Sequence, residues 1–181
     1  MKICVLYFPN TGLKMNWFRL PLGLITLGAC LERAGYKVVI IDGNCEKDGK
    51  ECLRKILQGQ EVLFLGISSM TGHQIFDGLQ IAKFFRELKP AIPIIWGGWH
   101  PTLIPKQTVE HPLVDIVVKG MGEKTIVAIA DKLSGKLSVE NIPGVVYKEN
   151  GRIIDSEPEF PKNIDEFPRA AYNLMDIEKY V

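Results

Sequence analysis

The sequence lacks the features that mark several common classes of protein. Its net charge is only +1, from 22 Lys and Arg against 21 Asp and Glu, so no strong field attracts nucleic acid or an acidic membrane. No apolar run reaches the length of a membrane span, and the apolar start of the chain meets Pro9 too early for a signal peptide. We therefore expect a cytoplasmic protein that binds neither nucleic acid nor a membrane.

Paired cysteine motifs are also missing. The chain has four cysteines, Cys4, Cys30, Cys45 and Cys52, and they form neither CxxC nor CxxxCxxC. This spacing does not suit a zinc site or an iron–sulfur cluster, and a reducing compartment removes the usual reason for disulfides. We expect four free thiols.

Short β-branched runs alternate with amphipathic stretches through the first two thirds of the chain. Strands are expected at 2–7, 37–41, 62–67, 92–96 and 114–118, and helices at 22–34, 50–58, 74–89 and 123–133, with a weak helical turn after residue 105. Successive βα units predict an α/β fold with a doubly wound, five-stranded parallel sheet of flavodoxin-like order 2-1-3-4-5. A chain of 181 residues can bury a sufficient core for this without disulfides or metal.

The character of the chain changes after Gly135. Asn150-Gly151 lies between two β-branched runs, which predicts an antiparallel hairpin. Three prolines among charged residues then predict a linker. We expect the sheet domain at 1–136, a β-hairpin extension at 137–156 and a linker at 157–181 that leads to a segment outside this chain.

Three loops at the carboxyl ends of the expected strands are candidates for a ligand site. They are Ser68-Ser69-Met70-Thr71, Gly97-Gly98-Trp99-His100-Pro101 and Gly120-Met121-Gly122-Glu123. Each has a structural alternative. Hydroxyl residues before a helix are often N-caps, paired glycines often form only a tight turn after a strand, and a Glu at the start of a helix can be a cap. Their occurrence together at one edge favours a broad site, where a surface without side chains receives a large flat ligand.

The same loops disfavour two other five-stranded folds. A receiver domain needs an aspartate after the third strand, where this chain has Ser68-Ser69. A flavodoxin needs a hydroxyl-rich loop after the first strand, where Thr11 is the single hydroxyl, and a dinucleotide-binding GxGxxG is missing there too.

In this order the motifs resemble the cobalamin-binding domain of methionine synthase, of mutases and of cobalamin-dependent radical S-adenosylmethionine (SAM) enzymes. The family pattern is DxHxxG, then SxL, then GG. Ser68-Ser69-Met70 resembles SxL, and residues 71–96 separate it from Gly97-Gly98. The DxHxxG window falls on residues 21–26, where Pro21 replaces Asp and Gly23 replaces the His that coordinates cobalt in the methionine synthase branch.

This departure, together with the GGxHxT and GxGE elements at 97–102 and 120–123, resembles the radical SAM branch. The resemblance implies that the chain binds cobalamin base-off, without a histidine ligand, as the N-terminal domain of a longer enzyme. A radical SAM barrel in the same full-length protein, beyond the linker, would carry SAM and a [4Fe-4S] cluster. The implied cofactor-binding residues are Pro21, Gly23, Ser68, Ser69, Met70, Thr71, Gly97, Gly98, Trp99, His100, Gly120, Met121, Gly122 and Glu123.

The resemblance also implies where the parts of the cofactor lie. The benzimidazole tail is expected between the third and fourth strand ends, past Ser68 and Thr71, and the corrin over the two glycine loops. A bulky residue at Gly98 is expected to abolish binding without unfolding the domain. Glu123 is expected to serve as a cap and as a polar contact beside the corrin.

The implied activity belongs to the longer enzyme, a methyltransferase or a cyclase, with methyl transfer expected first. No catalytic residue and no protein ligand to cobalt is assigned. His73 and His100 are expected to form hydrogen bonds rather than bind cobalt, and the first loop, with Trp17, Phe18 and Leu20, either covers the lower cobalt face, docks the barrel or packs over the sheet. The alternative is a non-cobalamin interaction or nucleotide-binding module on the same fold.

Overall fold

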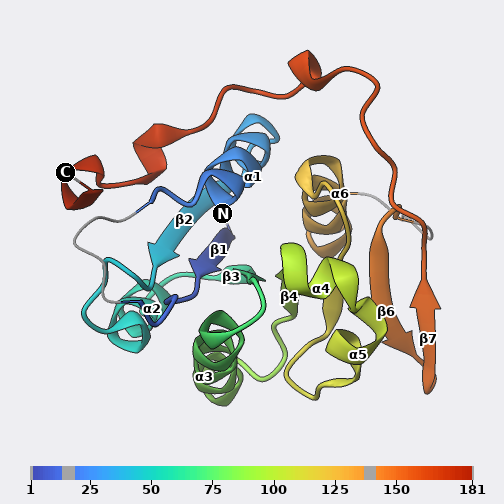
Figure 1. Ribbon diagram of the computed structural model, residues 1–181, viewed down its shortest axis with the longest axis horizontal. Helices are drawn as coiled ribbons and strands as arrows, with labels where there is room; N and C mark the ends of the chain where they lie inside the picture. Colours follow the sequence, from blue (N-terminus) through green and yellow to red (C-terminus); the bar gives the residue numbers. More distant parts are fainter. Residues whose placement is uncertain (1, 14–18, 137–141, 181) are drawn as a thin grey trace.

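The computed structural model describes residues 2–13, 19–136 and 142–180. A central, mostly parallel sheet is covered by helices on both faces (Figure 1). The strands are β1 (Ile3–Phe8), β2 (Lys37–Asp42), β3 (Val62–Ser68), β4 (Ile94–Gly97), β5 (Ile116–Val118), β6 (Val145–Glu149) and β7 (Arg152–Asp155). The α-helices are α1 (Leu22–Arg33), α2 (Gly49–Leu57), α3 (His73–Leu88), α4 (Trp99–Leu103), α5 (Pro105–Glu110) and α6 (Glu123–Leu133). An α/β fold with a mostly parallel sheet was expected, and it is confirmed.

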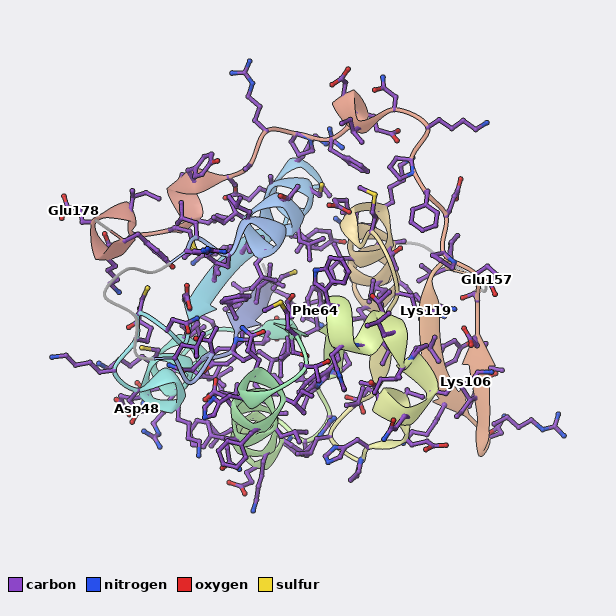
Figure 2. All side chains as sticks on the ribbon, in the orientation of Figure 1. Asp48, Phe64, Lys106, Lys119, Glu157 and Glu178 are labelled. Atoms are coloured by element: carbon purple, nitrogen blue, oxygen red, sulfur yellow. The ribbon has the colours of Figure 1, made fainter. Side chains whose placement is uncertain are left out.

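Two hydrophobic layers hold the helices against the sheet. One layer joins the sheet to α1 and α6 through residues such as Leu31 and Ile129, and the other joins it to α2 and α3 through residues such as Leu53 and Phe85. Phe64, fully buried in β3, lies near the middle of the molecule (Figure 2). The continuous apolar run of β3 is therefore explained by a strand that is covered on both faces.

The expected sheet of five strands is wrong in its strand count and in its full order. The sheet has seven strands in the order β2-β1-β3-β4-β5-β6-β7, with β1 to β5 parallel and β6 and β7 antiparallel. The predicted hairpin forms, and Asn150 and Gly151 at its turn have φ angles of 49° and 76°. It continues the sheet because β6 pairs with β5 through Val117 and Val146.

A second correction concerns the segment after β4. Gly97 to Pro101 was predicted to be a loop, yet α4 begins at Trp99, directly after Gly98. Pro101 falls in the first turn of this helix, where the missing N–H of proline costs no helical hydrogen bond. Pro101 therefore lies within a helix that it does not disrupt.

An ion pair fixes the hairpin to the parallel strands. The ammonium of Lys119, just after β5, lies 2.5 Å from a carboxylate oxygen of Asp155 at the end of β7. Lys119 is 9% exposed and lies near the hairpin (Figure 2). A second lysine, the more exposed Lys106, lies 3.7 Å from the other oxygen of Asp155. Asp155 thus neutralises a buried cation next to the Gly120 loop.

Residues 157–180 run back across α6 and α1 and end beside β2 (Figure 1). Arg33 donates a hydrogen bond to the Glu166 carbonyl at 2.7 Å, and the hydroxyl of Tyr180 donates one to Asp42, also at 2.7 Å. Leu174 fills the space left by the absent side chain of Gly28, where a Cβ would lie 2.5 Å from it. We call residues 157–180 the C-terminal segment.

Acidic pH is expected to loosen the end of the C-terminal segment. The ammonium of Lys179 donates a hydrogen bond of 2.6 Å to Glu46, which lowers the pKa of Glu46 below its ordinary value of 4.5. Because the folded pKa is lowered, the stabilisation is complete above pH 4.5 and is lost as the pH falls through the folded value. Both side chains are partly exposed, so the contribution is below about 1 kcal/mol.

The check is amide hydrogen exchange in residues 177–180 at about pH 6 and about pH 3.5, corrected for the intrinsic exchange rate. Protection should fall at the lower pH in the wild type and change less in Glu46→Gln. An equal fall in both proteins would assign the effect to other groups.

In the described part of the chain, no helix combines the length and the apolar character needed to cross a bilayer. The four cysteines are free, as expected. Burial raises the pKa of Cys4 to about 12, so its thiol stays protonated and unreactive at neutral pH.

Candidate functional site

Two adjoining cavities lie at the carboxyl ends of the parallel strands. The narrower has a volume of about 240 Å³ and the wider about 560 Å³. Both are lined by Gly23, Leu24 and Ser68, so they meet between the start of α1 and the end of β3. This is the edge at which open parallel sheets bind ligands.

The narrow cavity extends between the sheet and the two helices α1 and α6. Hydrocarbon and glycine make up nearly all of its wall, and among its described lining residues only Ser68 and Glu123 have polar side chains. The full lining is Leu6, Gly23, Leu24, Leu27, Gly66, Ile67, Ser68, Ile95, Gly97, Gly98, Val118, Gly120, Met121, Gly122, Glu123 and Ile126. Its chemistry suits a flat apolar group with few polar atoms.

The wide cavity opens over the strand ends and has more polar side chains in its described lining than the narrow one, among them Thr11, Asn44 and Gln74. It is lined by the first loop, by the start of α1 and by the segment after β3, with Trp99 at one side. Trp99 is 73% exposed and Met70 50% exposed. These exposed apolar side chains border a hollow large enough for part of a broad ligand.

All but two of the residues predicted to bind the cofactor line one of these cavities. Thr71 and His100 are the exceptions, and they form a hydrogen bond of 3.0 Å to each other at the edge of the site. The narrow cavity is lined by Gly97, Gly98 and the 120–123 loop. The wide one is lined by Pro21, Ser69, Met70 and Trp99. The structure thus brings three separate motifs together, while their contacts with a cofactor stay a prediction.

The capping alternatives for these motifs are wrong. The N-cap of α3 is Gly72 and that of α6 is Gly122, and neither helix start has a side-chain capping bond within the described residues. Ser69 Oγ and Glu123 Oε2 are instead buried without a hydrogen-bond partner in the part of the chain that the structure describes. Buried polar atoms of this kind are uncommon and indicate a missing partner.

The glycines of the site differ in whether they leave room for a side chain. Gly98 has a φ of 91°, and a Cβ there would lie 2.9 Å from the Ser69 carbonyl oxygen and 3.0 Å from its nitrogen. A side chain at Gly98 therefore strains the backbone, so we now expect a bulky residue there to destabilise the domain as well as to affect the site. A Cβ at Gly97 would meet nothing closer than 3.6 Å, and one at Gly23 nothing within 4 Å.

His73 and His100 form local hydrogen bonds, as expected, and His111 forms one that was not predicted. The Nδ1–H of His73 donates to the Asn10 carbonyl at 3.1 Å, and His111 accepts a bond from the Leu113 amide on the α5–β5 connection. Leu20 both lines the wide cavity and packs against the group around Ile25. Trp17 and Phe18 lie outside the described residues.

The apolar walls of the narrow cavity were missed at the level of the sequence. Leu6, Ile67 and Ile95 are ordinary strand residues, and only their position at the strand ends makes them cavity residues. A usable signal was Gly66, inside the apolar run of β3, because a glycine within a strand often marks close approach of another group.

The comparisons with known proteins identify a family and a fold. A family model described as B12 binding domain matches residues 19–130. The chain is 35% identical over 163 residues to an uncharacterized methyltransferase of Pyrococcus horikoshii, and the match covers 88% of this chain and 35% of that protein. The chain spans about a third of the length of the curated relatives it matches.

Two solved structures share the fold. The cobalamin-dependent SAM radical enzyme OxsB, with aqua-cobalamin and SAM bound, matches 99% of this chain and 25% of its own, with a TM-score of 0.83 and 21% identity. The radical SAM methyltransferase TsrM of Kitasatospora setae, with cobalamin and a [4Fe-4S] cluster bound, matches 88% of this chain and 30% of its own, with a TM-score of 0.75 and 22% identity. With a family model that matches more than half of its length, this chain belongs to the B12-binding domain family.

Proposed function

We propose that the chain holds cobalamin base-off, with no protein histidine on the cobalt, as the cofactor-carrying part of a longer radical SAM enzyme. The observation that carries the proposal is the narrow cavity with few polar side chains, which opens beside a wider one with several. Base-off cobalamin has the same two parts, a flat aromatic base on a flexible tail and a broad corrin ring with amide groups at its rim.

The narrow cavity fits the aromatic base. The glycines along its wall, among them Gly97 and Gly122, leave a flat surface, and Ile95 and Val118 add hydrocarbon. An aromatic ring loses water on entering such a space and needs few polar partners. In this proposal the glycine loops lie against the tail, whereas the resemblance implied that the corrin lies over them.

The wide cavity fits the edge of the corrin. Ser69 Oγ, buried without a partner among the described residues, is available for an amide of the corrin rim. Pro21, Leu22 and Gly23 lie on the other side of this cavity. Cobalamin supplies the cobalt chemistry, and these residues hold and orient the ring.

The absence of histidine among the described lining residues supports the axial part of the proposal. Neither cavity is lined by an imidazole in the described ranges, and His73 and His100 are engaged in the hydrogen bonds given above. Gly23 stands where the resembled family has its ligating histidine, and it has no side chain to coordinate cobalt.

For the whole protein we propose methyl transfer by a radical SAM barrel that binds SAM and a [4Fe-4S] cluster outside this chain. The relatives named as methyltransferases, and the third of their length that the chain spans, support this assignment. Residues 1–136 would form the cofactor domain, 137–156 its hairpin and 157–181 the connection to the barrel.

The test is retention of hydroxocobalamin by the purified chain. After loading and desalting, a bound corrinoid with a base-off visible spectrum is expected at about one equivalent per chain. Loss of the corrinoid on desalting would reject the proposal and favour a module that binds another ligand.

Gly23→His supplies a positive control for the missing axial ligand. Its Cβ enters open space, so the variant should fold and place an imidazole at the wide cavity. After reduction to Co(II), nitrogen splitting is expected in the electron paramagnetic resonance spectrum of the variant and not in that of the wild type. Nitrogen splitting in the wild type would show that the protein or the base already ligates cobalt.

A further inference from the structure

Gln74, the second residue of α3, lines the wide cavity and is nevertheless almost fully buried, with 3% of its surface exposed. Its side-chain amide carries two N–H donors and an acceptor oxygen. Such groups are unfavourable when they are buried without hydrogen-bond partners. The partners of Gln74 therefore show what this side chain does.

The amide of Gln74 joins two segments of the chain at the strand ends. Its Oε1 accepts a hydrogen bond of 2.8 Å from the Met70 amide, and its Nε2 donates one of 2.9 Å to the Pro9 carbonyl. Pro9 follows β1 and Met70 follows β3, and these two strands are parallel neighbours in the sheet. Gln74 thus bridges the ends of two adjacent strands.

Both of these segments border the wide cavity. Thr11 and Leu13 line it from the segment after β1, and Ser69 and Met70 line it from the segment after β3. The two segments therefore form two walls of the cavity, and the bridge through Gln74 fixes their spacing.

Other side chains of α3 hold only one of the two walls. His73 and Asp77 both form hydrogen bonds with the backbone of Asn10, and neither bonds to the segment after β3 in the described part of the chain. Loss of the Gln74 amide would remove the partner of the Met70 N–H and, in a buried position, that of the Pro9 carbonyl. A polar group left without a partner in this way favours movement of the segment that carries it.

We infer that Gln74 is a positioning residue for the corrin, because its amide fixes the spacing between these two walls of the wide cavity. The inference rests on the proposed function, in which the edge of the corrin occupies this cavity. Gln74 acts through the backbone of Pro9 and Met70 and needs no contact with the ring. A fixed spacing helps binding because the ring then meets walls that are already in place.

The experiment compares Gln74→Met with the wild type. Methionine has nearly the length and volume of glutamine but carries no amide. Dissociation constants for hydroxocobalamin come from visible titration. Those for cobinamide, which has the corrin ring and no nucleotide tail, come from its competition with cobalamin.

Ser156→Ala is the matched control. The Ser156 hydroxyl also bonds to backbone, with its Oγ 2.8 Å from the Ile142 carbonyl oxygen and 2.9 Å from that of Val145, and the residue lines neither the narrow nor the wide cavity. The control therefore loses stability at a place remote from the site. All titrations are made where circular dichroism shows each apo-protein to be fully folded.

Gln74→Met should weaken the binding of both corrinoids by the same factor, about ten- to hundred-fold, because the loss falls on the ring that they share. Ser156→Ala should lower the urea midpoint of the apo-protein and bind both corrinoids as the wild type does.

Gln74→Glu adds a readout that general destabilisation does not give. The ionised carboxylate still accepts from the Met70 N–H but has no donor for the Pro9 carbonyl, whereas the protonated carboxyl supplies that donor again. Burial raises the pKa of this carboxyl, so the affinity of the variant relative to the wild type should increase as the pH falls from about 8 to about 5.5. His73 and Asp77, the titratable neighbours on α3, are present in both proteins, so the ratio removes their contribution.

Four results would overturn the inference. Gln74→Met could bind both corrinoids as the wild type does, or lose affinity for cobalamin alone, which would assign the effect to the tail. Ser156→Ala could lose as much affinity as Gln74→Met, or the affinity ratio of Gln74→Glu could stay constant with pH. Failure of the wild type to retain any corrinoid would instead reject the proposed function, so the two failures are distinguishable.

Discussion

Leucine in place of Gly97 should abolish the retention of cobalamin and leave the domain folded. Gly97 ends β4 and lines the narrow cavity, and a Cβ there would lie no closer than 3.6 Å to the Val118 carbonyl oxygen. The added side chain therefore enters the cavity of about 240 Å³ and not the packed core. Since this cavity is the proposed place of the base, we expect affinity to fall at least about a hundred-fold, or more than about 2.7 kcal/mol.

A graded series makes this result interpretable. Gly97→Ala leaves most of the cavity open and should retain cobalamin with a small loss, while Gly97→Val should lie between the alanine and leucine variants. Thermal unfolding of the three apo-proteins should stay close to that of the wild type. If Gly97→Leu bound cobalamin as tightly as the wild type, the base would have to lie elsewhere.

Removal of the Asp155 carboxylate should give the largest loss of stability among the variants considered. Asp155→Ala leaves the ammonium of Lys119 buried without its partner at 2.5 Å. A buried pair broken on one side typically costs 3–5 kcal/mol, and the partial exposure of Asp155, 25% of its side chain, reduces our estimate to about 2–3 kcal/mol. Urea unfolding of the apo-protein measures this difference.

Two further variants separate the ion pair from general effects of mutation. Lys106→Met removes the more exposed lysine, 68% of whose side chain is accessible, and should change the unfolding free energy by less than about 0.5 kcal/mol. Lys119→Met combined with Asp155→Leu replaces both charges by apolar groups and should restore most of the lost stability. A double variant as unstable as Asp155→Ala would show that the pair itself is not the cause.

The parallel part of the fold could be predicted because its signals are local. The apolar run of β3 and the helix that ends before Gly35, whose φ is 87°, are visible within a few residues. The hairpin turn at Asn150-Gly151 is equally local. What the hairpin pairs with is not local, because the contact of Val146 with Val117 joins residues that are distant in sequence.

The candidate site could likewise be predicted only in part from the sequence. Its glycines and hydroxyls stand out in the sequence, and the strand order gathers them at one edge. The role of Gly98 could not be separated from that of Gly97 without the position of the Ser69 backbone. Nor could the sequence distinguish a capping Glu123 from one whose carboxylate lacks a partner, because that depends on Glu166 engaging Lys124 and Arg33.

The path of the C-terminal segment has a consequence for how the domain folds during synthesis. Tyr180 and Asp42, which form a hydrogen bond, are 138 positions apart in the sequence, and Lys179 and Glu46 are 133 apart. Contacts at such separation form late, because the intervening chain must first be made and ordered. On the ribosome, the outer surface of β2 and α1 therefore stays uncovered until residues 157–180 have emerged, and this later segment completes a layer that the first strands began.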